Sequence, residues 1–245
     1  MKNIKLIIEY DGKDFNGWQK QPNKLNIQGT IEQAIKTITG EDVDLNASGR
    51  TDAGVHSLGQ VANFKTNYEL PIEKWPLALN ANLKKSIVIK SAEEVDERFH
   101  SRLSCKRKTY RYIINNSKFG TAIYRNLETH IPQKLNIKKM QEAVKYFEGE
   151  HDFKAFKASG TSSRSSVRTI YKASVLEMPN DRIYIELTGN GFLYNMVRII
   201  SGTLVEVGLE KIEPKQIEDI IKSENREMAG KTLPPQGLYL LNVEY

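Results

Sequence analysis

The sequence predicts an α+β fold made of two similar halves. Segments with the two-residue alternation of strands are mixed with segments that have the helical spacing of apolar residues, and strands often follow one another directly. The order of elements begins again near residue 105, without a low-complexity linker. The 245 residues suffice for one large domain or two ordinary ones. We expect halves over residues 1–105 and 106–245, within one continuous structure.

The N-terminal half begins with a predicted strand. Ile4, Leu6 and Ile8 recur at every second position, which is the period of a β-strand. By the same reasoning, the expected strands of this half cover residues 2–10, 43–47, 60–66 and 87–89, and the expected helices cover residues 31–38 and 71–83.

Polar residues, glycine and proline mark the ends of these helices. Thr30 and Gln33 have the spacing of a capping box, and Gly40 ends the first helix. Pro71 opens the second helix. The loop after the first strand carries Trp18, which we expect to be exposed.

The C-terminal half repeats the mixture of strands and helices. Its expected strands cover residues 104–115, 167–177, 183–188 and 238–245, and its expected helices cover residues 137–147, 193–207 and a segment that begins at Pro214. The turn residues Pro179, Asn180 and Asp181 predict a hairpin between the two central strands. Residues 159–166 are rich in Ser and Gly and indicate a surface loop, whose Arg164 is either a phosphate contact or a solvated side chain.

The composition is that of a soluble globular protein. Hydrophobic residues make up 39% of the chain and charged residues 27%. No apolar run approaches the roughly 20 residues of a membrane span, and the N-terminus lacks the apolar core of a signal peptide. We therefore expect a cytoplasmic protein that does not associate with a membrane.

Cysteine and histidine usage argues against disulfides and metal sites. The single cysteine, Cys105, excludes an intrachain disulfide. The four histidines are scattered and lack the spacing of metal ligands, so that His151 beside Asp152 is only weak support for a metal phosphohydrolase. We expect no metal.

Basic residues are concentrated in two groups. The formal net charge of +6 favours polyanionic partners. The first group comprises Arg102, Lys106, Arg107, Lys108 and Arg111, and the second comprises Lys154, Lys157, Arg164 and Arg168. Of these, we expect Arg102, Lys106, Lys108, Arg164 and Arg168 to contact nucleic-acid phosphates.

A glycine-rich run surrounds one carboxylate and one guanidinium. The run is Gly49-Arg50-Thr51-Asp52-Ala53-Gly54-Val55-His56. Such a run is typical of a structural turn in which Asp52 accepts backbone hydrogen bonds. Glycines also let a backbone approach a ligand closely, which is typical of a functional loop. The residues alone leave both interpretations open.

Together with further motifs, this run resembles the signature of the tRNA pseudouridine synthase A family. The further motifs are Tyr10-Asp11-Gly12, Phe15-Asn16-Gly17-Trp18-Gln19, Ile27-Gln28-Gly29, Asn80-Ala81-Asn82-Leu83, Arg98-Phe99-His100-Ser101-Arg102, Lys108-Thr109-Tyr110-Arg111-Tyr112, Glu150-His151-Asp152-Phe153, Val167-Arg168-Thr169-Ile170, Gly191-Phe192-Leu193-Tyr194-Asn195-Met196-Val197-Arg198 and Ala229-Gly230-Lys231-Thr232. They follow one another in order over nearly the whole chain. Leu103 stands where many relatives have Phe, which we interpret as a packing substitution.

The resemblance implies a fold, a reaction and a site. It implies two ferredoxin-like halves with antiparallel and mixed sheets flanked by helices, and an active-site cleft between them. The family isomerises uridine to pseudouridine at positions 38, 39 and 40 of the tRNA anticodon arm, without a cofactor and as a homodimer. Asp52 matches the family's nucleophile and Tyr110 the tyrosine that lies against the target base. Arg198 matches the basic partner of the aspartate, and Arg50 an arginine that helps to extrude the nucleotide.

Two other classes of protein fit the sequence less well. A non-catalytic RNA-binding module would need no pair of Asp52 and Arg198. A nuclease or phosphohydrolase would normally need a metal cluster, for which the sequence shows no ligand spacing. Gly189-Asn190-Gly191 lacks the third glycine of a dinucleotide-binding loop. The apolar stretch 199–207 belongs to the core or to a subunit interface, and we favour the core.

Overall fold

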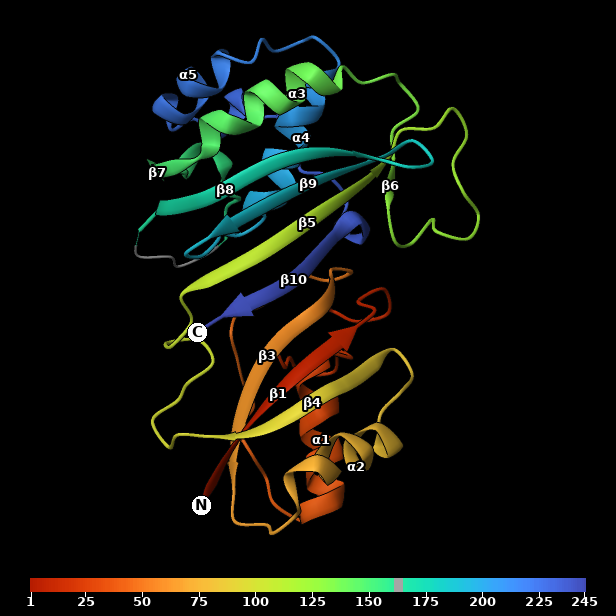
Figure 1. Cartoon of the computed structure of the whole chain (residues 1–245), viewed down its shortest axis with the longest axis vertical. Coiled ribbons are helices and arrows are strands. Elements are labelled where there is room, and N and C mark those ends of the chain that lie inside the picture. The colour runs from red at the N-terminus through yellow and green to blue at the C-terminus, as the bar shows by residue number, and fades with distance from the viewer. Residues whose placement is uncertain (161–164) are drawn as a thin grey trace. The chain divides into compact units, whose positions relative to one another are not determined.

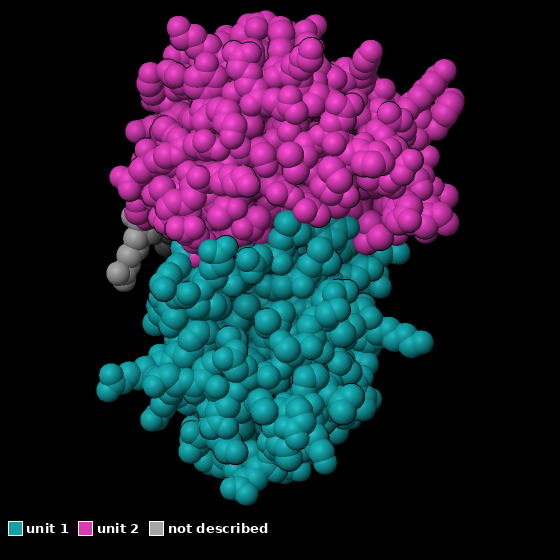
Figure 2. Space-filling view, in the orientation of Figure 1, with its two compact units in different colours: residues 1–106, 239–245 teal, residues 107–238 magenta. Residues whose placement is uncertain are grey.

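The computed structural model describes residues 1–160 and 165–245. These residues form two compact units, residues 1–106 with 239–245 and residues 107–238, which are coloured separately in Figure 2 and described separately below. The closing strand was expected in the C-terminal half, but residues 239–245 belong to the first unit. The reason is strand pairing, because Tyr239 and Leu240 lie beside His56 and Ser57 in a parallel ladder.

The first unit combines β-strands with α-helices (Figure 1). Its strands are β1 (Lys2–Tyr10), β2 (Asn46–Ala47), β3 (His56–Thr66), β4 (Ile87–Val95) and β10 (Leu238–Glu244). The order is β4-β1-β3-β10, with β2 paired to β3. Strand β1 is antiparallel to both neighbours, whereas β10 is parallel to β3. The helices are α1 (Ile27–Thr39) and α2 (Trp75–Asn82), and the 3-10 turn η1 (Ile72–Lys74) precedes α2.

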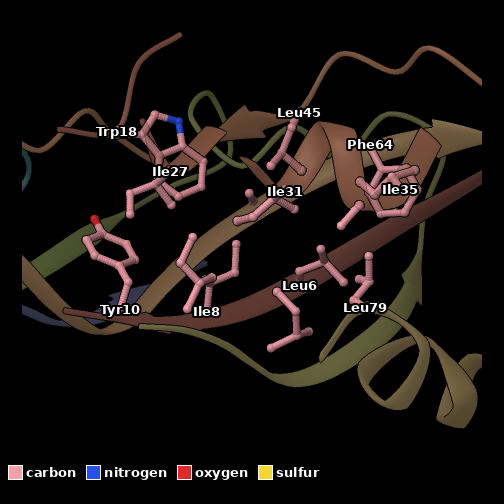
Figure 3. Close-up of a cluster of buried hydrophobic side chains, with 14 of the residues drawn as sticks. Leu6, Ile8, Tyr10, Trp18, Ile27, Ile31, Ile35, Leu45, Phe64 and Leu79 are labelled. Carbon is pink, nitrogen blue, oxygen red and sulfur yellow. The ribbon is translucent and has the colours of Figure 1, made fainter. Parts of the chain in front are cut away.

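The core of the first unit fills the space between the sheet and its helices. Ile4, Leu6 and Ile8 are buried on one face of β1, as their alternation predicted. They belong to one cluster with Ile31 and Ile35 of α1. Figure 3 shows Leu6 and Ile8 of the strand together with these two helix residues. Burying each such aliphatic side chain contributes about 1.5–3 kcal/mol, so this shared face explains why the strand and the helix form together.

Two local expectations for this unit were wrong. Trp18 is 2% exposed and is part of the core, because its backbone carbonyl accepts from Gln28 at the start of α1 and draws the loop under the helix. Helix α1 was expected to begin after a cap at Thr30, but it begins at Ile27. Asn26 is its N-cap, because the Asn26 side chain accepts from the Gly29 N–H at 2.8 Å.

The second unit also combines a sheet with helices. Its strands are β5 (Arg107–Asn115), β6 (Thr129–His130), β7 (Gly149–Asp152), β8 (Val167–Met178) and β9 (Arg182–Gly189). The order is β5-β9-β8-β7 with antiparallel neighbours, and β6 is parallel to β5. The helices are α3 (Ile137–Ala143), α4 (Met196–Gly208) and α5 (Gln216–Ser223), with 3-10 turns η2 (Val144–Phe147), η3 (Lys154–Phe156), η4 (Arg226–Met228) and η5 (Pro235–Gly237). The expected α+β class is confirmed.

Helix α4 is the most deeply buried helix among the described residues. It begins at Met196 rather than Leu193, because Asn195 has a φ of 61° and turns the chain before the helix. The expected hairpin is present as β8 and β9, with Asn180 and Asp181 in the left-handed region at the turn. Among the described residues, no helix has the length and apolar character that a membrane span requires.

Candidate functional site

The first part of the candidate site is the loop over residues 48–55, between β2 and β3 of the first unit. Asp52 lies on this loop, outside any helix or strand, and is partly buried, whereas Arg50 is exposed. The Asp52 carbonyl accepts from the Val55 N–H at 3.1 Å, and Gly54 has a φ of 78°. The run is therefore a tight turn, as its composition indicated. We call residues 48–55 the Asp52 loop.

The loop that follows β1 lies against the Asp52 loop at backbone distance. A Cβ atom on Gly12 would come within 2.0 Å of the Val55 carbonyl oxygen, and one on Gly17 within 2.5 Å of the Thr51 carbonyl oxygen. The Trp18 N–H donates to the same Thr51 carbonyl at 3.0 Å. The two glycines are required here because no side chain fits between the two backbones.

A buried side-chain hydrogen bond adds to these backbone contacts. The Tyr10 hydroxyl lies 2.8 Å from Thr51 Oγ1, and the two residues are 3% and 7% exposed. Burial raises the pKa of Tyr10 to about 12, against the opposing effect of its hydrogen bonds with Thr51, Gln60 and Ser57. The phenol therefore keeps its proton at neutral pH and remains able to donate.

His56 ends the run and occupies a buried position at the start of β3. Its Nδ1 accepts from the Gly12 N–H at 3.1 Å, and its ring stacks on Tyr239 with a centroid distance of 4.8 Å. The Asp11 carboxylate also lies 3.1 Å from Nδ1. A protonated Nδ1 would donate to Asp11 and could no longer accept from Gly12, so the bond to Gly12 belongs to the ring with Nδ1 unprotonated.

The other end of the Asp52 loop is tied to β3. The Gln60 side chain accepts from the Ser48 hydroxyl at 2.7 Å and donates to the Gly49 carbonyl at 2.9 Å. The Ser48 N–H donates to the Val61 carbonyl at 2.8 Å. The loop is therefore held on both sides of Asp52, by β3 at its start and by the loop after β1 at its end.

Two of the expected phosphate contacts, Arg102 and Lys106, belong to the first unit and lie on the segment over residues 96–106. Arg102 and Lys106 are both exposed there. Ser101 is buried and donates from its backbone and its hydroxyl to Asn63 Oδ1 at 2.9 and 2.8 Å. Asn63 in turn donates to Asn3 at 2.9 Å. A buried polar network thus fixes the segment while its cationic side chains remain exposed to solvent.

The second part of the candidate site lies in the second unit, where Tyr110 belongs to β5. Tyr110 pairs with Leu187 of β9 and is 8% exposed. The Phe192 ring meets it edge-on, with a centroid distance of 5.1 Å and an interplanar angle of 79°. Strand pairing fixes the backbone of Tyr110 and the aromatic contact fixes its ring.

Arg198 lies in the first turns of α4, in the same unit as Tyr110. Its Nε donates to the Leu233 carbonyl at 2.7 Å, and one terminal nitrogen donates to Asn195 Oδ1 at 2.6 Å. Both acceptors are neutral, so these two bonds orient the guanidinium without neutralising its charge.

The segment that carries Leu233 is itself packed against α4. A Cβ atom on Gly202 would meet the Lys231 carbonyl oxygen at 1.8 Å, and one on Gly230 would meet the Thr203 nitrogen at 2.6 Å. The Gly230 N–H donates to the Thr203 hydroxyl at 2.9 Å. The motif at residues 229–232 therefore has a structural consequence, because it places the carbonyl that orients Arg198.

The remaining residues of the expected phosphate-binding set differ in their surroundings. Lys108 is partly buried in β5. Arg168 is partly buried in β8, where its guanidinium donates to the Ser165 and Val167 carbonyls at 3.1 and 2.6 Å and burial lowers its pKa. Arg164 lies outside the described residues. Among the described residues, no group of three or more His, Cys, Asp or Glu side chains could hold a metal ion.

The structure thus groups the site residues within each unit. Arg50 and Asp52 share one loop of the first unit, and Tyr110 and Arg198 belong to the second. Sequence reasoning assigned no role to Tyr10, although it stands in a motif of the family. The available signal was the position of Tyr10. It is the last residue on the buried face of β1, and the loop that follows it contains two glycines.

Comparison with known proteins identifies the class to which this chain belongs. The profile of the family described as "tRNA pseudouridine synthase" matches residues 6–103 and 143–245. A "tRNA pseudouridine synthase A" of Caldicellulosiruptor saccharolyticus is 55% identical over 245 residues, and one of Acetivibrio thermocellus is 53% identical, with all of both chains covered in each case. The chain belongs to the tRNA pseudouridine synthase A family, which confirms the resemblance seen in its motifs.

Solved structures give a more distant match. A chain in the structure titled "Crystal Structure of a Cbf5-Nop10-Gar1 Complex" aligns with 96% of this chain and 57% of its own length, at 14% identity and a TM-score of 0.36.

Proposed function

We propose that this protein isomerises uridine to pseudouridine in tRNA, at positions 38, 39 and 40 of the anticodon arm, with Asp52 as the nucleophile. The observation that carries the proposal is the Asp52 loop. Its sequence matches the family's signature, and its backbone is held on both sides of the carboxylate by β3 and by the loop after β1. Catalytic groups need such a preorganised support, because small displacements cost much of the rate.

The reaction sets clear demands on a carboxylate. The bond between uracil N1 and ribose C1′ breaks, the base turns over, and a bond forms between C5 and C1′. The proton on C5 is then released, and N1 carries a proton in the product. An ionised carboxylate serves this chemistry by attacking the sugar or the base, or by taking a proton from the sugar. Each of these routes requires Asp52 in its charged form.

Arg198 and Arg50 supply positive charge in the proposed site. A guanidinium cannot lose its proton in a protein, so it favours the charged form of a neighbouring carboxylate under all working conditions. Arg198 is oriented for such a role by Leu233 and Asn195. The side chain of Arg50 is exposed, which suits contact with the target nucleotide that has to leave its base stack in the tRNA.

Tyr110 supplies the surface for the extruded base. Moving a nucleotide out of its stack costs a few kcal/mol. Stacking of a base on an aromatic ring returns about 1–3 kcal/mol. The edge contact from Phe192 supports a role of this kind, because it fixes the plane of the Tyr110 ring.

The partner in this proposal is the anticodon arm of tRNA, bound by a homodimer in the cytoplasm. The phosphate contacts are assigned to Arg102, Lys106, Lys108, Arg164 and Arg168. The exposed positions of Arg102 and Lys106 on an ordered segment support this assignment for the first unit. Binding through phosphates weakens as salt concentration rises, because bound counterions are released.

The nucleophile is tested by Asp52→Asn, which removes the charge and keeps the shape. We expect normal folding and tRNA affinity, but loss of at least about a thousandfold in tritium release from tRNA labelled at uridine C5, as for loss of other covalent nucleophiles. The matched control is Asp44→Asn, an exposed aspartate of the same unit, which should keep full turnover. Substantial turnover by Asp52→Asn would refute the assignment, and binding without turnover by the wild type would favour a non-catalytic RNA-binding module.

A further inference from the structure

The position of Asp52 depends on contacts made by its neighbours in the loop. Asp52 lies in neither a helix nor a strand, so no ladder of backbone hydrogen bonds fixes it. A shift of about 1 Å in a catalytic group costs on the order of a hundredfold in rate. Groups that hold the adjacent residues are therefore candidates for a role in the reaction without touching the substrate.

Thr51, the residue immediately before Asp52, is held in two ways. Its carbonyl accepts from the Trp18 N–H, which is a backbone contact. Its side chain meets the Tyr10 hydroxyl at 2.8 Å, and this is a contact that a single side-chain substitution removes. Tyr10 stands at the end of β1, where Ser57 of β3 is its antiparallel partner, so its own backbone is fixed.

The bond between Tyr10 and Thr51 is protected from water. Both side chains are buried, and the Tyr10 ring also packs against Trp18 with a centroid distance of 6.1 Å. A buried hydroxyl that loses its partner is costly, so the pair stays joined in the folded state. The raised pKa of Tyr10, about 12, keeps the phenol protonated over the range in which RNA enzymes work.

We propose that Tyr10 is a positioning residue for Asp52, acting through the Thr51 side chain. The proposal rests on the proposed function, because it takes Asp52 as the reacting group. Tyr10 fixes the torsion of the chain on one side of Asp52, and the Val55-to-Asp52 turn fixes it on the other. Tyr10 itself is buried and takes no part in substrate contact or proton transfer.

The test compares four variants by single-turnover kinetics, with the enzyme in excess over tRNA and its concentration varied up to saturation. Tyr10→Phe and Thr51→Val each remove one partner while keeping the shape, and we expect each to lower the rate roughly tenfold with the apparent KM within about twofold of wild type. Thr51→Ser keeps the hydroxyl and should retain nearly the full rate. The double variant Tyr10→Phe with Thr51→Val should be no slower than Tyr10→Phe alone, because Tyr10→Phe already loses the bond to Thr51 together with the contacts of its hydroxyl with Gln60 and Ser57.

Tyr245→Phe is the matched control for a purely structural role. Tyr245 is a partly buried tyrosine of the same unit, and its hydroxyl donates to the Ser101 carbonyl at 2.9 Å rather than to the Asp52 loop. We expect it to lower the melting temperature about as much as Tyr10→Phe and to leave the rate unchanged. All rates are measured at a temperature at which every variant is folded.

The outcomes separate this inference from the proposed function. A wild-type rate for Tyr10→Phe, or equal rate losses for Tyr10→Phe and Tyr245→Phe, overturns the positioning role while an inactive Asp52→Asn leaves the nucleophile in place. Turnover by Asp52→Asn refutes the nucleophile and with it the positioning role. A rate loss confined to Tyr10→Phe and Thr51→Val, with recovery in Thr51→Ser, supports the inference.

Discussion

The two units hold their candidate site residues in different ways. In the first unit, Asp52 lies on a loop whose position comes from close backbone contacts at Gly12 and Gly17. In the second unit, Tyr110 and Arg198 lie on a strand and a helix, where regular hydrogen bonding fixes the backbone and neighbouring side chains or carbonyls fix the orientation. The Asp52 loop is therefore most sensitive to added bulk, and the second unit is most sensitive to loss of a hydrogen-bond or packing partner.

Among changes to the contacts that support the site residues, the largest effect is expected from added bulk beside the Asp52 loop. Gly17→Ala introduces a Cβ 2.5 Å from the Thr51 carbonyl oxygen, at a φ of 80°. The left-handed backbone costs about 1–2 kcal/mol, and overpacking adds about 1–3 kcal/mol. Because the displaced group adjoins Asp52, we expect the turnover rate to fall at least about a hundredfold. Chemical denaturation and single-turnover kinetics measure the two effects.

The control for this variant is Gly40→Ala. Gly40 has a φ of 75°, yet no atom lies within 4 Å of an added Cβ. It shares the backbone strain without the collision, so it should lose only about 1–2 kcal/mol of stability and keep its rate. Equal behaviour of the two variants would show that contact between the two loops does not fix Asp52.

A smaller effect is expected from altering the partner bonds of Arg198. Arg198→Lys keeps the charge but cannot hold the Leu233 carbonyl and Asn195 in two fixed directions. We expect the rate to fall about ten- to a hundredfold, with an unchanged affinity for tRNA. Arg182→Lys is the control, because that guanidinium is also held within the second unit, by a 2.7 Å bond to the Glu128 carboxylate. If Arg198→Lys and the wild type had equal rates, the reaction would not depend on the fixed orientation of the Arg198 guanidinium.

The smallest effect is expected from removing the aromatic contact that supports the Tyr110 ring. Phe192→Leu removes the edge contact with Tyr110, and an aromatic pair contributes about 0.5–1.5 kcal/mol. We expect kcat/KM to fall about two- to tenfold. Phe147→Leu removes a comparable edge contact with Phe156, at a centroid distance of 5.2 Å, and should lower stability without lowering kcat/KM. If Phe192→Leu kept the wild-type kcat/KM, the ring of Tyr110 would not depend on this contact.

Much of the fold and part of the candidate site could be predicted from the sequence. Strand β1 and the hairpin of β8 and β9 could be predicted because their signals are local. The alternation of apolar residues and the turn residues both lie within a few consecutive positions. The family could be predicted from the sequence because its motifs are defined by particular residues at particular positions. The same match named Asp52, Tyr110 and Arg198 as candidate site residues. Helix ends were less well predicted, since the cap at Asn26 competed with a plausible alternative at Thr30.

The tertiary structure decided what depends on residues far apart in the chain. Trp18 is buried because the loop after β1 folds under α1, and residues 239–245 belong with β3 because of strand pairing. The hydrogen bond between Tyr10 and Thr51 joins residues 41 positions apart. The sequence by itself determined which residues stand on the Asp52 loop. Only packing determined what holds that loop, because close approach of two backbones leaves no local pattern beyond a glycine.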